Sequence, residues 1–361
     1  MANLQKEDIT KMQIKRIENE IRDTPKHKAT EHYVGRLRAK LAKLKERIEE
    51  QESKKTGGGG GYAIRKQGDA TVILIGPPST GKSTLLNRLT NAHSKVAPYL
   101  FTTVSVIPGM MQYKNTDIQI LDVPGLIEGA DIGKGRSREV LSVVRGADLI
   151  IIMSDIDRVQ AIKHIAKTLE SSGIRINKKK PEVKIEKKNS GGLIIHSNIK
   201  QGVDKETIKE IAREMGIKNA EITIKESLDV EELIDAFSKN RVYVPAIFVI
   251  NKIDVGNFQN HEKFILISAE KGSGIKKLKK AIWRKLGFVR VYLVNPDAEP
   301  DFSNPIVVKS GYSLADVAKK IGGEFFENKK GAKIWGNGAK FPGQEVSLGK
   351  EVVEGMMIRF F

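Results

Sequence analysis

The stretch 76–84 combines the residue types that bind nucleotide phosphates. An apolar run at 72–75 leads into a loop bounded by two glycines, and a leucine-rich stretch follows at 84–89, so the order is strand, loop, helix. Glycines let the backbone wrap around phosphate, successive N–H groups and a helix N-terminus attract negative charge, a lysine reaches the β and γ oxygens, and a hydroxyl can ligate Mg²⁺. The predicted phosphate-binding residues are Gly76, Pro77, Pro78, Ser79, Thr80, Gly81, Lys82, Ser83 and Thr84.

Two later segments carry groups suited to the γ-phosphate and its metal ion. Thr102 and Thr103 are adjacent hydroxyls, and we expect Thr103 to close onto Mg²⁺ and the γ-phosphate; a plain pair of strand-entry threonines is the alternative. Asp122 follows the apolar run 118–121 and is expected to hold the metal through water, while the N–H of Gly125 contacts the γ-phosphate. The predicted metal ligands are Ser83, Thr103 and Asp122, and the predicted catalytic groups are Lys82, Thr103 and Gly125.

Two more strand ends supply groups that recognise a purine base. Asp254 lies just after the apolar run 244–250, and its carboxylate can accept both N–H groups at the N1/N2 edge of guanine. Adenine offers no such donor pair, so ATP is a disfavoured substrate. We expect Asn251 and Lys252 to brace the base and the phosphate loop. The segment that should donate a backbone N–H to guanine O6 is Ser268, Ala269 and Glu270.

Composition limits the remaining chemistry and suggests a polyanionic partner. The 361 residues include no cysteine, which leaves oxygen-ligated metal and phosphate handling as the available chemistry. No apolar run is long enough to span a membrane and the N-terminus carries no secretory pattern, so we expect a cytoplasmic protein. A formal net charge of +18 is unusual for a metabolic enzyme and favours nucleic acid as a partner.

The rest of the chain divides by pattern and composition. Residues 1–56 show helical periodicity with a dense basic face, which either binds RNA or a partner helix or is a solvated surface; a glycine-rich linker follows at 57–70. The nucleotide-binding domain is predicted over 71–163 and 240–289, since the distance from Gly125 to Asn251 exceeds one βαβ step. The insert, 164–239, has the order ββαβ, with 183–186 and 193–196 expected as a hairpin.

The phosphate loop, the metal-binding segments and the base-binding segments resemble those of the TRAFAC class of P-loop GTPases. Within this class, the stretches 101–103, 122–130 and 133–136 resemble developmentally regulated GTP-binding (DRG) proteins of the Obg-like group. This resemblance implies a doubly wound, mainly parallel α/β sheet with an N-terminal helical hairpin, an inserted S5-like α+β subdomain and a C-terminal β-grasp (TGS) domain at 290–361. It implies Mg²⁺-dependent hydrolysis of GTP to GDP, K⁺ as a further cation, and a role beside ribosomes. Family K⁺ sites use an Asn where Ser79 stands, and Leu126 replaces the water-orienting Gln of Ras-like GTPases.

Partners follow from the same resemblance and from the basic segments. Ribosomes or RNA are expected to bind the N-terminal helices, the insert and the TGS domain, and eukaryotic family members use dedicated partner proteins. The alternative to a translation GTPase is an RNA-binding module that is gated by nucleotide and in which hydrolysis is incidental. Its RNA affinity would fall steeply with salt and change little between GDP and a GTP analogue.

Overall fold

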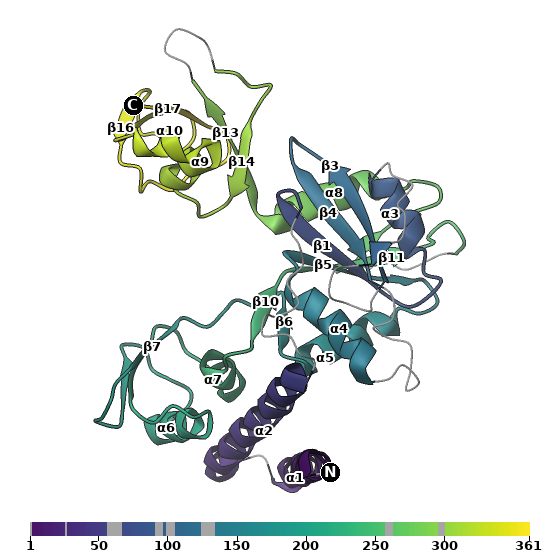
Figure 1. Ribbon diagram of the computed structural model, residues 1–361, viewed down its shortest axis with the longest axis vertical. Coiled ribbons are helices and arrows are strands. Elements are labelled where there is room, and N and C mark those ends of the chain that lie inside the picture. The colour runs from purple at the N-terminus through teal and green to yellow at the C-terminus, as the bar shows by residue number, and fades with distance from the viewer. Residues whose placement is uncertain are drawn as a thin grey trace. The chain divides into compact units, whose positions relative to one another are not determined.

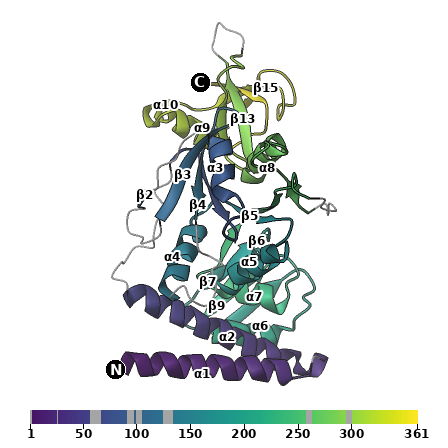
Figure 2. The ribbon, with the colours of Figure 1, turned by 90° about the vertical axis from the view of Figure 1, so that its right-hand side faces the viewer.

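The computed structural model describes residues 2–25, 27–55, 67–90, 97–98, 105–123, 134–256, 263–294 and 300–361 (Figures 1 and 2). The chain divides into two compact units, each assembled from two separate stretches. The first combines Met1–Gly61 with Gly173–Tyr243, and the second combines Tyr62–Ser172 with Val244–Phe361. Within the described ranges, every helix is too short or too polar to cross a lipid bilayer.

The second unit is built around a mainly parallel sheet whose central strands β1, β5 and β11 are rich in Val, Ile and Leu. The strands lie in the order β12-β11-β5-β1-β4-β3-β2, with β3 antiparallel to β4 and β2 antiparallel to β3. Their bounds are β1 Ala70–Ile75, β2 Ala97–Pro98, β3 Ser105–Gln112, β4 Asp117–Asp122, β5 Leu149–Asp155, β11 Ala246–Asn251 and β12 Ile265–Leu266. The expected α/β fold with a doubly wound, mainly parallel sheet is confirmed.

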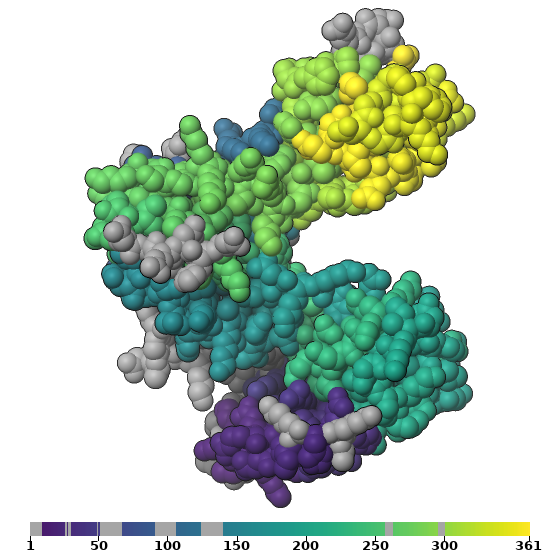
Figure 3. Space-filling view, turned by 180° about the vertical axis from the view of Figure 1, so that it is seen from behind, coloured from purple at the N-terminus to yellow at the C-terminus, as the bar shows by residue number. Residues whose placement is uncertain are grey.

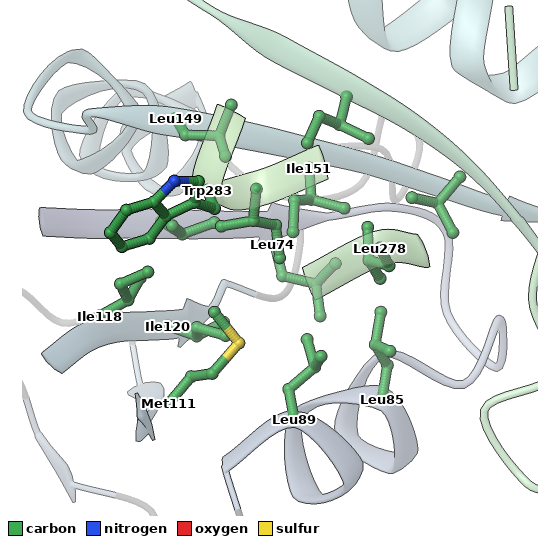
Figure 4. Close-up of a cluster of buried hydrophobic side chains, with 14 of the residues drawn as sticks. Leu74, Leu85, Leu89, Met111, Ile118, Ile120, Leu149, Ile151, Leu278 and Trp283 are labelled. Carbon is green, nitrogen blue, oxygen red and sulfur yellow. The ribbon is translucent and has the colours of Figure 1, made fainter. Parts of the chain in front are cut away.

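Helices cover both faces of this sheet, which explains why its strands are apolar on both sides. The helices α3 (Lys82–Thr90) and α8 (Ile275–Leu286) pack on one face, where Leu74, Leu85 and Leu278 share a buried core with Trp283 (Figure 4). The alternate strand residue Ile73 is also fully buried but faces away from that core. The opposite face carries α4 (Lys134–Arg145) and α5 (Gln160–Ser171), as Figure 1 shows.

In the first unit, the N-terminal helices pack on the insert. The hairpin of α1 (Ala2–Asp23) and α2 (Lys28–Lys55) lies beside the insert helices α6 (Lys205–Glu214) and α7 (Val230–Phe237). Gly35, Ala39 and Ala42 form a stripe of small residues at helical spacing, and Ala39 and Ala42 join the core of the insert. A side chain added at Gly35 would contact Thr207 at 3.5 Å, so the small stripe permits this close approach.

The insert contains the expected ββαβ order, but its first two strands do not form the predicted hairpin. β7 (Val183–Lys187) and β8 (Leu193–Ser197) both pair with β9 (Ala220–Ile224), which lies between them. β7 is antiparallel to β9 and β8 is parallel to it. The hairpin prediction was wrong because β9, the most buried of the three strands, takes the central position, where Ile222 and Ile224 are fully buried.

The structure divides the insert from the sheet-containing unit at Gly173 and Tyr243, whereas the sequence placed these limits at 164 and 239. The helix α5 accounts for the difference at the first limit. Its buried residues Ile162, Ile165 and Leu169 pack beside β5, so the helix belongs to the second unit. At the second limit, β10 (Val242–Val244) pairs with β6 (Ile174–Ile176) at the base of the insert.

The C-terminal segment of the second unit has its own mixed sheet and core. Its strands lie in the order β14-β13-β17-β15-β16, with β13 parallel to β17, so the chain has an additional C-terminal β domain. The helix α9 packs its residues Leu314 and Val317 into the core of this sheet. The bounds are β13 Phe288–Leu293, β14 Ile306–Lys309, α9 Leu314–Ile321, α10 Gly323–Glu327, β15 Ala332–Trp335, β16 Gln344–Val346 and β17 Met356–Phe360.

A capping box begins α9 and gives a first prediction. The hydroxyl of Ser313 accepts from the N–H of Asp316 at 3.3 Å, and the Asp316 carboxylate accepts from the N–H of Ser313 at 2.8 Å. Replacing Ser313 with Ala should destabilise this domain by about 1 kcal/mol, because the N–H of Asp316 keeps only the Ser313 carbonyl as acceptor and the Asp316 carboxylate loses the Ser313 hydroxyl as donor. Thermal unfolding of Ser313→Ala should be compared with that of Ser310→Ala, an exposed serine of the same domain. Equal unfolding temperatures would contradict the role of the cap.

Candidate nucleotide-binding site

The phosphate loop lies between the end of β1 and the start of α3, and its lysine is held against the loop itself. Lys82 is the first residue of α3, and its Nζ donates to the carbonyl oxygens of Gly76 at 3.0 Å and Pro77 at 2.9 Å. The Thr80 hydroxyl also donates to the Pro77 carbonyl, at 2.9 Å. The loop therefore encircles the ammonium group, which places a positive charge at its centre.

Two positions in the loop accept only glycine. A Cβ at Gly76 would lie 2.1 Å from the carbonyl oxygen of Met153 on β5, so the loop passes too close to the next strand for a side chain. Gly81 has φ of +89°, and a Cβ there would lie 2.5 Å from Nδ2 of Asn251. Ser79 also has a left-handed φ, of +61°, which is uncommon for a residue with a Cβ and was not predicted.

Asp122 lies at the end of β4, next to the hydroxyl of the phosphate loop. Its Oδ2 accepts a hydrogen bond from Ser83 Oγ at 2.9 Å, and its side chain is almost fully buried. Burial raises the pKa of Asp122, while the Ser83 hydrogen bond and the charge of Lys82 oppose that shift. Within the described residues, the buried Oδ1 has no hydrogen-bond partner. A carboxylate oxygen without a partner beside a hydroxyl fits a hard cation with oxygen ligands, such as Mg²⁺.

Asn251, at the end of β11, joins the two halves of the site. Its Nδ2 donates to the Thr80 carbonyl in the phosphate loop at 2.8 Å, and its Oδ1 accepts from the N–H of Ala269 at 2.9 Å. Asn251 and Ser268 are buried, whereas Glu270 is exposed. This side chain therefore fixes the distance between the loop at 76–83 and the loop at 268–270.

The carboxylate predicted to read the base is exposed and oriented by its neighbour. A hydrogen bond from the Ser268 side chain and one from its own backbone N–H lower the pKa of Asp254. The same Ser268 hydroxyl accepts from the N–H of Lys271 at 3.0 Å, which closes the turn after β12. An exposed and ionised carboxylate with one fixed partner keeps acceptor capacity for a ligand.

Three charged residues behind the site were missed by the sequence analysis. Asp155, at the end of β5, is buried and accepts from Arg158 Nη2 at 2.6 Å and from Lys252 Nζ at 3.4 Å. These partners lower the pKa of Asp155. Arg88 of α3 donates to the carbonyl oxygens of Ala269 and Glu270. The position of Asp155 directly after an apolar strand was a signal, as it was for Asp122, but Arg88 showed none.

The structure brings together most of the residues that the motifs single out. The phosphate loop, Asp122, Asn251 and the loop 268–270 are linked by the hydrogen bonds above, and Lys252, with φ of +63°, follows Asn251 directly. Thr84 is exposed in the first turn of α3. Thr102, Thr103, Gly125 and Leu126 lie outside the described residues, so their predicted roles stay predictions.

Comparison with known proteins agrees with this geometry. A family model described as 50S ribosome-binding GTPase matches residues 71–188, and one described as the C-terminal region of MMR_HSR1 domain matches 190–288. An uncharacterized GTP-binding protein of Methanocaldococcus jannaschii is 44% identical over 95% of this chain and 90% of its own length. Developmentally-regulated GTP-binding protein 2 of Homo sapiens is 38% identical over 93% and 94%, and Developmentally-regulated G-protein 2 of Arabidopsis thaliana is 37% identical over 93% and 87%. The chain belongs to the family of developmentally regulated GTP-binding proteins.

Proposed function

We propose that this protein hydrolyses GTP to GDP and phosphate with Mg²⁺ and that it does so in association with the ribosome. The observation that carries the first part is the 2.9 Å hydrogen bond between the exposed Ser83 hydroxyl and the buried Asp122 carboxylate, beside the carbonyls of Gly76 and Pro77 that hold Lys82. Serine and aspartate oxygens at this point are the ligands that Mg²⁺ takes in P-loop NTPases. Thr103 is proposed as a third metal ligand.

The residues of the site divide the work of phosphoryl transfer. Lys82 and the N–H groups of the loop neutralise charge on the β/γ bridge and the γ oxygens, and Gly125 N–H contacts the γ-phosphate. Ser83 and Asp122 would hold Mg²⁺, which would supply further charge neutralisation when bound. Because Leu126 is apolar, the attacking water must be oriented by backbone, another polar side chain, a monovalent cation or a partner, and we expect slow intrinsic turnover.

At the other end of the site, Asp254 is proposed to read the guanine N1 and N2 edge. The N–H of Ala269 already donates to Asn251, so we propose the N–H of Glu270 as the donor to guanine O6. Arg88 holds the carbonyls of this turn from the α3 side. The ammonium of Lys252 donates to Asp155 at 3.4 Å.

Replacing one carboxylate oxygen of Asp254 with an amide nitrogen tests whether this residue recognises guanine. Asp254→Asn should weaken GTP binding about 100-fold, because a charge-assisted hydrogen bond pair is lost and a donor faces a donor. The same variant should bind XTP better than GTP, since xanthine offers an acceptor in place of the amino group. Competition of both nucleotides against a fluorescent GDP analogue measures this. The control is Asp157→Asn, which changes an exposed carboxylate shortly after the end of β5. This variant should keep the wild-type preference for GTP over XTP. An unchanged preference in Asp254→Asn would exclude the guanine-edge role.

Ribosome association is supported by the description of the matching family model and by the net charge of +18. The test is the rate of GTP hydrolysis by the purified protein in K⁺ and in Na⁺ buffer, each with and without ribosomes. Stimulation by ribosomes supports a translation GTPase, and a K⁺ requirement would show that Ser79 serves a monovalent cation site. A rate near zero in every condition would favour the nucleotide-gated RNA-binding module.

A further inference from the structure

The most basic helix of the second unit is α8, which the sequence analysis did not connect with RNA. The segment 271–290 contains Lys271, Lys276, Lys277, Lys279, Lys280, Arg284, Lys285 and Arg290 and not one acidic residue. Six of these cations lie on α8 itself, whose sequence is IKKLKKAIWRKL. The helix begins at Ile275, with Gly274 as its N-cap, shortly after the loop 268–270 of the nucleotide site.

The helix separates its apolar and basic residues by face. Ile275, Leu278, Ile282, Trp283 and Leu286 are buried, and all of them belong to the main core of the second unit. Five cations of α8 are exposed, namely Lys276, Lys277, Lys280, Arg284 and Lys285. Lysine and arginine at 276, 280 and 284 recur every four residues, so they form one stripe about 12 Å long at 1.5 Å per residue. In Figure 3 the green part of the chain, which includes α8, lies open on the surface.

Four of these cations, all but Lys285, have no acidic partner in the part of the chain that the structure describes. Within the described residues, Lys276, Lys277, Lys280 and Arg284 form no ion pair. The packing of the opposite face fixes the helix, so the charges project from a rigid element. A fixed row of uncompensated cations creates a positive potential that attracts a polyanion.

On the other basic surfaces, only a part of the cations is paired: within the described residues, Lys180 and Lys187 of the insert and Lys15, Arg16 and Lys40 of the hairpin also form no ion pair. On the insert, cations pair with acidic residues in Lys179–Glu182, Lys184–Glu186, Lys188–Glu221 and Lys209–Glu206. On the hairpin, Lys45 pairs with Glu18 and Arg38 pairs with Glu231. Paired cations contribute little field, because each acid cancels its partner beyond the pair. The density of lysine that the sequence shows at 178–188 therefore overstates the positive potential of that surface.

We propose that the exposed face of α8 binds the phosphate backbone of RNA. This inference rests on the proposed association with the ribosome and names a contact surface for it on the GTPase domain itself. An anionic membrane is the less suitable partner, because membrane-surface helices combine basic residues with an apolar face that enters the lipid, and the apolar face of α8 is buried in the core. The contact is sequence-independent, since lysine and arginine recognise phosphate charge and not base edges.

The experiment removes four charges from α8 and, in a matched control, four charges from the insert. The first variant is Lys276→Gln, Lys277→Gln, Lys280→Gln and Arg284→Gln, and the control is Lys179→Gln, Lys184→Gln, Lys188→Gln and Lys209→Gln. Both lose the same net charge. Binding to a mixed-sequence RNA duplex is measured by fluorescence anisotropy over a series of salt concentrations. Binding to vesicles with and without phosphatidylserine, GDP affinity and thermal unfolding are measured on the same preparations.

Removing the α8 charges should weaken RNA binding about 100-fold near 0.1 M salt and reduce the slope of log K against log salt by about 3, because four phosphate contacts no longer release counterions. The control should lose less than about 5-fold, since its lysines are already paired. GDP affinity and unfolding temperature should stay at wild-type values in both variants.

Three outcomes would overturn the proposal. Equal losses in the two variants would mean that net charge alone governs binding. Wild-type RNA affinity in the α8 variant, with RNA binding by the parent protein intact, would exclude this surface while leaving RNA association standing. Binding of the parent protein to anionic vesicles but not to RNA would replace RNA with a membrane and would also remove the proposed RNA association.

Discussion

Replacing Lys82 with alanine is expected to lower the rate of GTP hydrolysis about 10³-fold, because one positive group aimed at developing phosphate charge is lost from a preorganised site. GTP binding should weaken as well, since the same ammonium contacts the nucleotide in its ground state. The backbone of the loop should change little. Gly76 and Pro77 lose one donor to their carbonyls, but Thr80 still donates to Pro77. Single-turnover hydrolysis at saturating GTP and Mg²⁺ separates the rate effect from the binding effect.

The matched control for Lys82 is Lys163→Ala, an exposed lysine of α5 in the same unit. It removes the same side chain and charge away from the site, and its rate should equal that of the wild type. Hydrolysis by Lys82→Ala at the wild-type rate would refute the assignment of residues 76–84 as the phosphate site. A loss of rate in both variants would point to an effect of general charge or stability.

Asp122→Asn is expected to separate stability from activity. The rate of Mg²⁺-dependent hydrolysis should fall about 10²- to 10³-fold, because the neutral amide cannot balance the charge of the cation. In the absence of nucleotide and Mg²⁺, the variant should instead unfold at a higher temperature, by about 2–4 °C for each kcal/mol gained. The reason is that the native carboxylate is buried, its Oδ1 has no hydrogen-bond partner among the described residues, and burial raises its pKa, so its charged form opposes folding.

Asp117→Asn provides the comparison, since Asp117 lies exposed at the other end of β4. It should alter neither hydrolysis nor the unfolding temperature by a measurable amount. Calorimetry with and without Mg²⁺ and GDP tests both parts of the Asp122 prediction. If Asp122→Asn unfolds at a lower temperature than the wild type without ligands, the carboxylate serves the fold and not a bound cation.

The sequence predicted the phosphate loop, Asp122 and the guanine motif because each of these follows an apolar strand within a few residues. The order of the strands in the sheet brings those strand ends together. The prediction therefore did not depend on knowing which distant residues contact one another. The cap of α9 was predictable for the same reason, since Ser313 and Asp316 are close in sequence. Local spacing was sufficient wherever the chemistry was local.

Features that depend on distant partners could not be predicted. The central place of β9 depends on competition among three strands for one buried position, so the adjacent strands were wrongly paired as a hairpin. Gly35, Ala39 and Ala42 indicate a close helix contact only when the partner helices α6 and α7 are known. Arg88 contacts residues 269 and 270, which are far from it in the sequence. Equally, counting lysines could not distinguish the paired cations of the insert from the unpaired ones of α8.

The packing of Ala39 of α2 into the core of the insert affects the order in which the chain can fold during synthesis. The hairpin that ends at Lys55 is made first, but its partners begin only at Gly173. Meanwhile β5 also lacks its neighbour β11, which starts at Ala246. Domains fold as units as they emerge. Neither unit can therefore complete its core until the chain has been synthesised beyond Ala246. For most of its translation, the nascent protein therefore carries a helix with an unmatched apolar face and a sheet with an open edge.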